Sequence, residues 1–236
     1  ADSSPKDPSR YLEELMQMQG EAPGSVIIVP PMPYVGHLGI PSGVPQGRVK
    51  IGVQQPYNLT AKQAAELGIT YWLVGHQERR EPDDAVNRQL REALEAGLQP
   101  VLVVYETASQ HERGLTRDIL KGQLARRLHG IHPADLRRIP IVYELSGDDP
   151  NAAPPKHLTL NPDAVNRKLT IIHEILSEEY GQPIARSMRW GFGGSMDATT
   201  IRSYAGQAEM QVPMLGSGSL DAGQFAKTIA EVPASK

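Results

Sequence analysis

The chain has 236 residues, contains no cysteine and is close to neutral, with 24 lysines and arginines against 27 acidic residues and a formal net charge of −3. The lack of cysteine excludes disulfides, thiolate metal sites and cysteine nucleophiles, and the charge balance argues against nucleic acid as the main partner, because a surface that follows phosphates needs a basic excess. With 39% hydrophobic residues and no apolar run of about 18 residues, the sequence predicts a folded protein without a membrane-spanning segment, which we expect in the cytoplasm.

The first nine residues are polar and contain Pro5 and Pro8. They lack a basic start followed by an apolar stretch, so they do not form an intact signal peptide, and they leave open whether this end is processed or trimmed. We expect residues 1–9 to be irregular.

From about residue 10 onward, apolar runs rich in β-branched residues alternate with amphipathic helical patterns. Each run is short and almost continuously apolar, as in parallel strands that are covered on both faces. The runs predict seven strands at Val26–Val29, Val49–Val53, Tyr71–Val74, Val101–Val104, Ile139–Tyr143, Met188–Trp190 and Val212–Leu215.

The patterns between these runs predict seven helices, or eight if residues 107–128 are split. They lie at Arg10–Met18, Ala61–Leu67, Ala85–Ala96, Thr116–Leu128, Pro162–Tyr180, Ala198–Ala205 and Ala222–Val232. Thr60, Asn161 and Asp197 are expected to cap three of them, because their side chains can accept hydrogen bonds from free backbone N–H groups. The alternation predicts one domain over residues 1–236, with a parallel sheet and helices outside it. Seven strands leave both an open sheet and a closed barrel possible.

Residues that can carry chemistry follow the predicted strands, where the sites of parallel α/β folds lie. His76 and Glu144 can form an acid–base pair whose pKa values burial can tune. Two glycine-rich turns, at residues 191–195 and 216–219, each precede a helical pattern, and their backbone N–H groups can hold a phosphate. Together they predict proton transfer on a small phosphorylated substrate.

Each of these features also has a purely structural interpretation. A glycine turn can be only a turn, a glutamate after a strand can cap a helix, and His76 can be a buried, hydrogen-bonded histidine. The other six histidines show no metal-ligand spacing, so we expect no metal site and interpret them as surface or loop residues: His37, His111, His129, His132, His157 and His173.

Four short motifs resemble those of the triose-phosphate isomerase family. Residues 75–80, Gly-His-Gln-Glu-Arg-Arg, resemble its Gly-His-Ser-Glu-Arg-Arg, and residues 142–144, Val-Tyr-Glu, resemble its Ala-Tyr-Glu. Residues 192–195 resemble its Tyr-Gly-Gly-Ser, and residues 215–220 resemble its Val-Gly-Gly-Ala-Ser-Leu. The order and approximate spacing agree from about residue 10 to residue 232. The resemblance implies a (β/α)₈ barrel, here with a missing or atypical first strand.

The resemblance also implies an activity and roles for individual residues. The reaction is the glycolytic interconversion of glyceraldehyde 3-phosphate and dihydroxyacetone phosphate, or of a related sugar phosphate, through an enediolate and without any cofactor. Glu144 matches the base, His76 the imidazole that polarises the substrate oxygens, and Glu78 the acidic residue that follows it. The backbone that holds the phosphate matches Gly193, Gly194, Ser195, Gly216 and Ser217, and the lid begins at Ser146, Gly147 and Asp148.

The chain departs from the family's pattern in several places. It has no Asn-x-Lys motif near its start, and Lys6 is the nearby candidate for the missing cationic electrophile. The loop that docks into a partner subunit is reduced to residues 55–58, so we expect a monomer or a differently built oligomer. The lid segment, residues 145–157, is longer. Phe192 and Ser217 stand where the family has Tyr and Gly.

Hypotheses that assign the chain to different classes of function therefore remain open. The chain is either an isomerase of this family or a catalytically impaired homologue that serves as a phosphate-ligand-binding or structural module. A third interpretation, an unrelated open-sheet phosphate-binding domain, requires four ordered motifs to coincide by chance.

Overall fold

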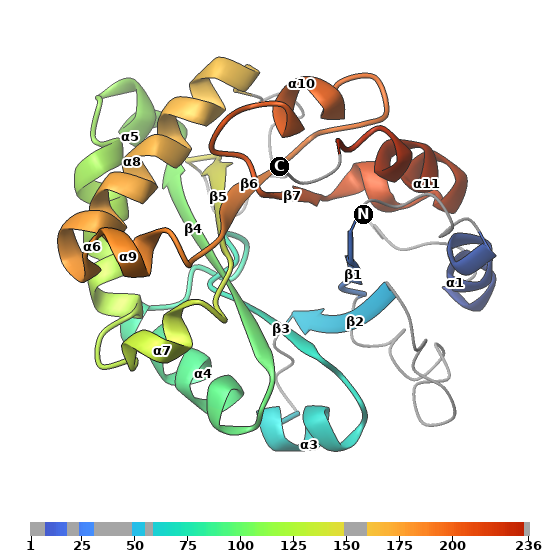
Figure 1. Ribbon diagram of the computed structural model, residues 1–236, viewed down its shortest axis with the longest axis horizontal. Coiled ribbons are helices and arrows are strands. Elements are labelled where there is room, and N and C mark those ends of the chain that lie inside the picture. Colours follow the sequence, from blue (N-terminus) through green and yellow to red (C-terminus); the bar gives the residue numbers. More distant parts are fainter. Residues whose placement is uncertain (1–7, 18–23, 31–48, 55–58, 149–159, 234–236) are drawn as a thin grey trace.

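The computed structural model describes residues 8–17, 24–30, 49–54, 59–148 and 160–233 (Figure 1). In this part of the chain, seven parallel strands form one sheet in the order β1-β2-β3-β4-β5-β6-β7, so that each strand pairs with the next one in sequence. The strands are β1 Val26–Ile28, β2 Val49–Gln54, β3 Tyr71–Val74, β4 Gln99–Thr107, β5 Ile141–Ser146, β6 Trp190–Gly194 and β7 Val212–Leu215. All seven predicted strands are confirmed, although β5 and β6 lie a few residues later than expected.

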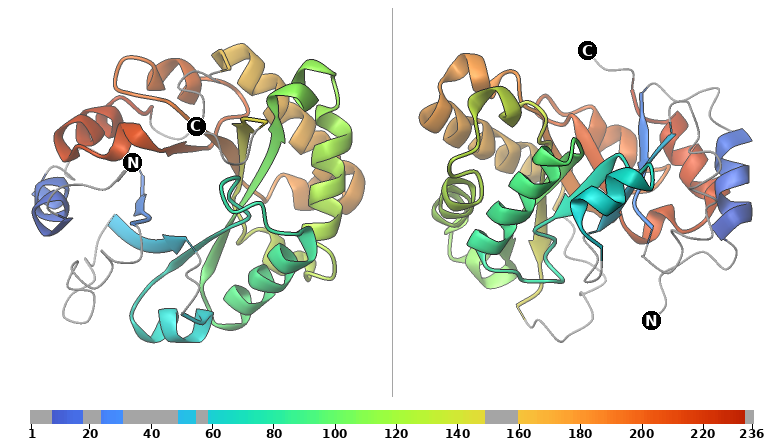
Figure 2. Two further views of the ribbon diagram at one scale, coloured as in Figure 1. Left: turned by 180° about the vertical axis from the view of Figure 1, so that it is seen from behind. Right: turned by 90° about the horizontal axis from the view of Figure 1, so that it is seen from below.

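The helices surround the curled sheet on its outer side (Figures 1 and 2). They are α1 Pro8–Gln17, α3 Ala61–Glu66, α4 Asp83–Glu95, α5 Ala108–Glu112, α6 Thr116–Arg127, α7 Pro133–Leu136, α8 Pro162–Tyr180, α9 Gln182–Ala185, α10 Ile201–Ala205 and α11 Ala222–Ala230, with a 3₁₀ helix, η3, at Ser217–Ser219. The seven predicted helices are present, and splitting residues 107–128 is correct. Helices α7 and α9 escape prediction because four residues are too few to show a periodicity.

Two of the three predicted caps are confirmed. The side chain of Thr60 accepts a hydrogen bond from the Gln63 N–H, and that of Asn161 accepts one from the Ala164 N–H. Asp197 accepts bonds from the N–H groups of Thr199 and Thr200, but it caps a turn. Helix α10 begins only at Ile201, so its predicted start at residue 198 is wrong.

Apolar side chains fill both faces of the sheet. The main core lies between the strands and the helices. A smaller cluster lines the concave face, and it contains Leu73, Val101, Val103 and Val142. Because side chains alternate between the faces of a strand, Glu144 shares the concave face with Val142. Within the described residues, β1 and β7 each pair with one strand only, so the ring is not closed there.

The two ends of the described chain lie together. Helix α1 packs against α11, as Figure 1 shows, and the Tyr11 hydroxyl donates a 2.6 Å hydrogen bond to the Ser219 carbonyl. Within the described ranges, no helix is both long and apolar enough to cross a bilayer.

Candidate active site

The predicted site residues that the structure describes lie at the carboxyl ends of four strands. His76 follows β3, Glu144 lies near the end of β5, Gly193 and Gly194 end β6, and Gly216 follows β7. The register pairs Glu144 with Gly193 and Gly194 with Leu215. The parallel topology thus brings together groups that are far apart in sequence. Lys6 lies outside the described residues.

His76 and Glu144 face each other. The Nε2 atom of His76 lies 3.4 Å from Oε1 of Glu144, and their side chains are only 16% and 7% exposed. The other carboxylate oxygen of Glu144, Oε2, is buried and has no hydrogen-bond partner within the described structure. A buried acceptor without a partner is costly, so this oxygen is available to accept a hydrogen bond from a ligand.

The protonation of His76 is set by opposing effects. Burial, the largest single effect, disfavours the imidazolium, but the charge and hydrogen bond of Glu144 and the charge of Glu78 favour it and raise the pKa of His76 overall. Glu78 Oε2 lies 3.8 Å from His76 Nδ1. The Glu78 backbone N–H donates to the same Nδ1 at 3.4 Å, so the neutral ring carries its proton on Nε2, toward Glu144.

The turn before His76 depends on a glycine and a buried arginine. Gly75 has φ +74°, and a Cβ there would lie 2.8 Å from the Val103 carbonyl and 2.9 Å from Nη1 of Arg127. Arg127 is 2% exposed and donates from Nη1 to that carbonyl, while its Nε pairs with Asp83 at 2.7 Å. This arginine thus supports the turn that presents His76. Sequence reasoning missed it, because a helical arginine shows no sign of burial.

Glycine at position 193 makes room for the Glu144 carboxylate. A Cβ on Gly193 would lie 2.8 Å from Oε1 of Glu144 and 2.7 Å from the Met214 side chain. Any larger residue would therefore displace the carboxylate.

The two glycine turns are in contact, because a Cβ on Gly218 would lie 2.4 Å from the Met196 carbonyl. Ser195, Gly216 and Ser217 are exposed. Within the second turn, residues 217–219 themselves form the 3₁₀ helix η3, and α11 begins at Ala222. The expectation that both turns open helices is wrong for the first, because α10 starts at Ile201.

The three residues expected to begin a lid are described, whereas residues 149–159 are not. Ser146 ends β5 and is buried, and Gly147 follows it. Asp148 is exposed, and its pKa is lowered by hydrogen bonds from Ser109 and Thr107. Asp148 therefore has hydrogen-bond partners on α5 and at Thr107, the residue that caps this helix.

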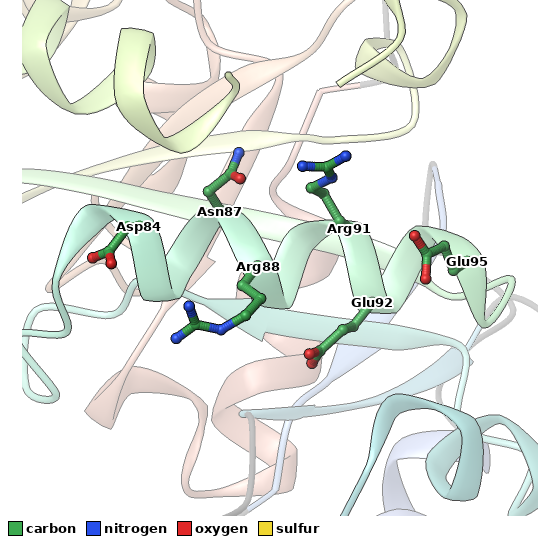
Figure 3. A pocket seen from close by; sticks show the side chains of 6 residues that line it. All are labelled: Asp84, Asn87, Arg88, Arg91, Glu92 and Glu95. Atoms are coloured by element: carbon green, nitrogen blue, oxygen red, sulfur yellow. The ribbon is translucent and has the colours of Figure 1, made fainter. Parts of the chain in front are cut away.

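Two shallow pockets lie on the helical side of the fold. One, of about 400 Å³, is the outer face of α4 and contains no predicted site residue (Figure 3); it is lined by Asp84, Asn87, Arg88, Arg91, Glu92 and Glu95. The other, of about 520 Å³, lies between α6 and the loop before α4, and it includes Arg80, Tyr105 and Arg127. Neither includes His76 or Glu144, so the chemistry of the strand ends, not the pocket shape, defines the candidate site.

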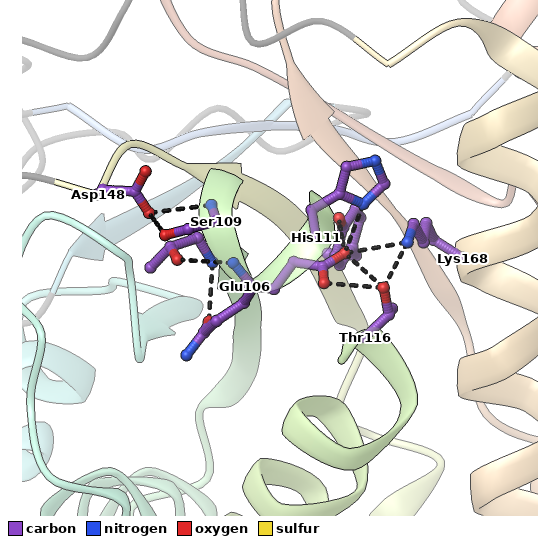
Figure 4. Close-up of polar contacts among 9 residues, drawn as sticks. Glu106, Ser109, His111, Thr116, Asp148 and Lys168 are labelled. Carbon is purple, nitrogen blue, oxygen red and sulfur yellow. Dashed lines mark hydrogen bonds and ion pairs between the residues drawn. The ribbon is translucent and has the colours of Figure 1, made fainter. Parts of the chain in front are cut away.

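A buried carboxylate beside the site was not assigned a role from the sequence. Glu106, near the end of β4, is fully buried and accepts a hydrogen bond from Thr116 (Figure 4). It accepts another from Tyr143, the residue before Glu144. Burial and the charge of Glu106 raise the pKa of Tyr143. Lys168 lies 3.1 Å and His111 3.3 Å from Glu106 Oε1, so the charge is paired.

Two of the six histidines interpreted as surface or loop residues are only partly exposed and have polar partners, while His37 and His157 lie outside the described residues. His111 lies on α5 beside Glu106. His173 lies on α8, where its ring packs 4.7 Å from that of Trp190 and its Nδ1 lies 3.4 Å from Glu209. Helical periodicity alone does not reveal such polar contacts.

A curled parallel sheet with helices outside and its polar groups at the carboxyl ends of the strands defines a TIM-type (β/α) barrel. The chain belongs to the triosephosphate isomerase family, whose sequence model matches residues 5–232. It is 27% identical over 242 residues to the triosephosphate isomerase of Caldanaerobacter subterraneus subsp. tengcongensis, covering 96% of this chain and 94% of that protein. It is 30% identical over 191 residues to that of Alkaliphilus metalliredigens, covering 75% of each chain, and 26% identical over 233 residues to that of Clostridium perfringens strain 13, covering 93% and 91%.

Proposed function

We propose that the chain is an isomerase that interconverts glyceraldehyde 3-phosphate and dihydroxyacetone phosphate, or a closely related sugar phosphate, through an enediolate. The observation that carries this proposal is the pairing of His76 with Glu144, 3.4 Å apart, beside a buried carboxylate oxygen without a partner. Family membership supports the same reaction class.

In this mechanism Glu144 removes a proton from the carbon next to the carbonyl. The C–H electron pair forms the enediolate double bond, and negative charge builds up on the carbonyl oxygen. The Nε2–H of neutral His76 donates to that oxygen and stabilises the charge. His76 then gives this proton to the former carbonyl oxygen and takes up the proton of the neighbouring hydroxyl, so that one proton moves between the two oxygens. Protonated Glu144 returns its own proton to the former carbonyl carbon while the neighbouring carbon becomes the new carbonyl. The carboxylate and the neutral imidazole are thus regenerated and no cofactor is consumed.

The phosphate of the substrate is assigned to the two glycine turns. The backbone at Gly193, Gly194 and Ser195 faces the same strand ends as Gly216 and Ser217, and backbone N–H groups in such turns bind anions. Glu78 tunes His76 by its charge. The segment that starts at Ser146, Gly147 and Asp148 is assigned as the beginning of the lid.

The test is an assay of the purified chain on both triose phosphates and on longer sugar phosphates. We expect turnover in the wild type and a loss of about 10²–10⁴-fold in kcat for Glu144→Gln and for His76→Gln. The matched control is Glu112→Gln, an exposed glutamate on α5, which should retain full activity.

The same assay decides between this function and the impaired homologue. Wild-type protein that turns over none of these compounds but is protected from thermal unfolding by inorganic phosphate would support a phosphate-binding module instead. Lys6→Ala tests the missing electrophile: a loss of about 10²–10³-fold in rate would assign the cationic role to Lys6. Sedimentation of the purified chain tests the proposed monomer or differently built oligomer.

A further inference from the structure

The end of β5, immediately after Glu144, is held from two sides. On one side, Nη2 of Arg80 donates to the Gly147 carbonyl at 2.8 Å and contacts the Ser146 hydroxyl at 3.3 Å. On the other side, the backbone N–H and the hydroxyl of Ser109 donate to Oδ1 of Asp148 at 3.0 and 2.5 Å (Figure 4). Residues 146–148 are thus held between the loop that follows β3 and helix α5.

Arg80 comes from the loop that carries His76. It has φ +45° and is the one non-glycine residue with positive φ among the described residues. Such a conformation costs free energy and persists only where the surroundings hold it, often at functional sites. The Arg80 guanidinium contacts residues 146 and 147, and these contacts stabilise this conformation. They also connect the loop that carries His76 to β5, the strand that carries Glu144.

Ser109 comes from a short helix that is itself fastened to β4. Thr107 and Gln110 form a capping box at its start. His111, on the same helix, lies 3.3 Å from the buried Glu106 carboxylate. Ser109 therefore presents its two donors to Asp148 from a fixed position.

These contacts act on the position of the base through strand geometry. Glu144 and Ser146 are two residues apart in β5, so their side chains point to the same face. The Arg80 contact is thus made on the face that carries the base. A displacement of about 1 Å in a reacting group can cost about 10²-fold in rate.

We propose that Arg80 and the Ser109–Asp148 pair are positioning residues, which hold the end of β5 so that the Glu144 carboxylate faces His76. The proposal rests on the proposed function only for its kinetic consequence. The geometric part concerns where Glu144 lies and needs no turnover.

The geometric part is tested by NMR titration of the His76 ring. In the wild type the nearby Glu144 raises the His76 pKa, and Glu144→Gln gives the value without that charge. We expect Arg80→Ala to shift the His76 pKa down toward the Glu144→Gln value, because the carboxylate moves away. Removal of a positive charge alone would shift it upward, so the two causes have opposite signs. The control is Arg88→Ala, an exposed arginine on the outer face of α4 (Figure 3).

Ser109→Ala tests the second anchor without any change of charge. It removes the hydroxyl donor but keeps the backbone N–H, so we expect a smaller downward shift of the His76 pKa, and Ser109→Thr should restore the wild-type value. If Arg80→Ala does not fold, Arg80→Lys replaces it, because lysine keeps the charge and loses the guanidinium geometry. An unchanged or raised His76 pKa in the folded arginine variant, together with an unchanged one in Ser109→Ala, would overturn the proposal.

Kinetics provide the second measurement. We expect Arg80→Ala to lower kcat by about 10–100-fold with KM unchanged, because the phosphate turns do not move. If the wild type shows no turnover, the proposed function is wrong, and the His76 titration still decides the positioning role. A fall in kcat with an unchanged His76 pKa would also count against positioning.

Discussion

The Nε2 atom of His76 lies 3.4 Å from Oε1 of Glu144 although a whole strand, β4, separates β3 from β5 in the sheet. The two side chains meet at the carboxyl ends of the strands, where His76 comes from the loop after β3 and Glu144 from β5 itself. The proton on the ring and the charge on the carboxylate are consequently coupled.

The pH dependence of activity follows from this coupling. The pKa of His76 is raised above its ordinary value of 6.5, so a mechanism that needs neutral His76 gains activity as the pH rises through a value above 6.5. Glu78→Gln removes one of the raising charges, and we expect the acidic limb of kcat/KM to move to lower pH. A limb that stays in place in Glu78→Gln would show that another group controls it.

The stability of the folded protein should change with pH in the opposite direction to the activity. A raised pKa in the folded state means that the native protein binds the proton of His76 more tightly than the unfolded chain. The resulting stabilisation is fully present below pH 6.5 and is lost as the pH rises through the folded-state pKa. Denaturant unfolding at several pH values measures this slope, and the slope should be smaller in His76→Gln. Equal slopes for both proteins would contradict the prediction.

Gly193→Ala should damage activity through the base. The new Cβ would lie 2.8 Å from Glu144 Oε1, so the carboxylate has to move, and we expect a loss of about 10²-fold in kcat. Gly24→Ala is the matched control, because a Cβ at position 24 meets nothing within 4 Å. Steady-state kinetics measure the loss, and wild-type kcat in Gly193→Ala would show that the site adapts.

Tyr11→Phe should loosen the second glycine turn. It removes the 2.6 Å hydrogen bond to the Ser219 carbonyl, which stabilises the fold by about 0.5–1.5 kcal/mol. We expect Tm to fall by about 2–4 °C per kcal/mol and inhibition by inorganic phosphate to weaken. Tyr180→Phe, on α8, serves as the control for phosphate inhibition. Unchanged phosphate inhibition in Tyr11→Phe would show that this hydrogen bond does not affect phosphate binding at the second glycine turn.

Arg127 and Arg126 form a matched pair on α6. Both pair with Asp83, but Arg127 is 2% exposed and Arg126 is 63% exposed. Breaking a buried pair costs about 3–5 kcal/mol, whereas an exposed pair is worth about 0–1 kcal/mol. Arg127→Ala should therefore lose far more unfolding free energy than Arg126→Ala in denaturant titrations. Similar losses in the two variants would contradict the role of burial.

The sequence allowed the strands to be predicted wherever apolar residues are continuous. It misplaced β6, which runs from Trp190 to Gly194, because glycines argue against a strand. They are required here, since a Cβ on Gly191 would lie 1.8 Å from the Val212 carbonyl. The end of β5 was missed for a related reason: Glu144 and Ser146 are polar, yet both are buried.

The candidate site was predictable from its motifs and from the rule that parallel strands end at one edge. His76 and Glu144 were expected near each other, and their contact is confirmed by the structure. The contacts of Arg80 and Ser109 with the end of β5 were not predictable. They join segments distant in sequence, and no local pattern marks an arginine or a serine as a partner of a later strand.

The consecutive strand order also bears on how the chain is made. Each strand can pair with the one synthesised just before it, so the sheet can grow as the chain leaves the ribosome. Helix α1 is the exception, because its partner α11 is the last of the described helices, and Tyr11 and Ser219 are 208 residues apart. Chain synthesis proceeds at about 5–20 residues per second. The side of α1 that carries Tyr11 and Leu15, which is buried in the folded protein, therefore stays without α11 for about 10–40 s. Among the described helices, α1 therefore waits longest for its partner, and a chain stalled before α11 would expose α1 to chaperones and proteases.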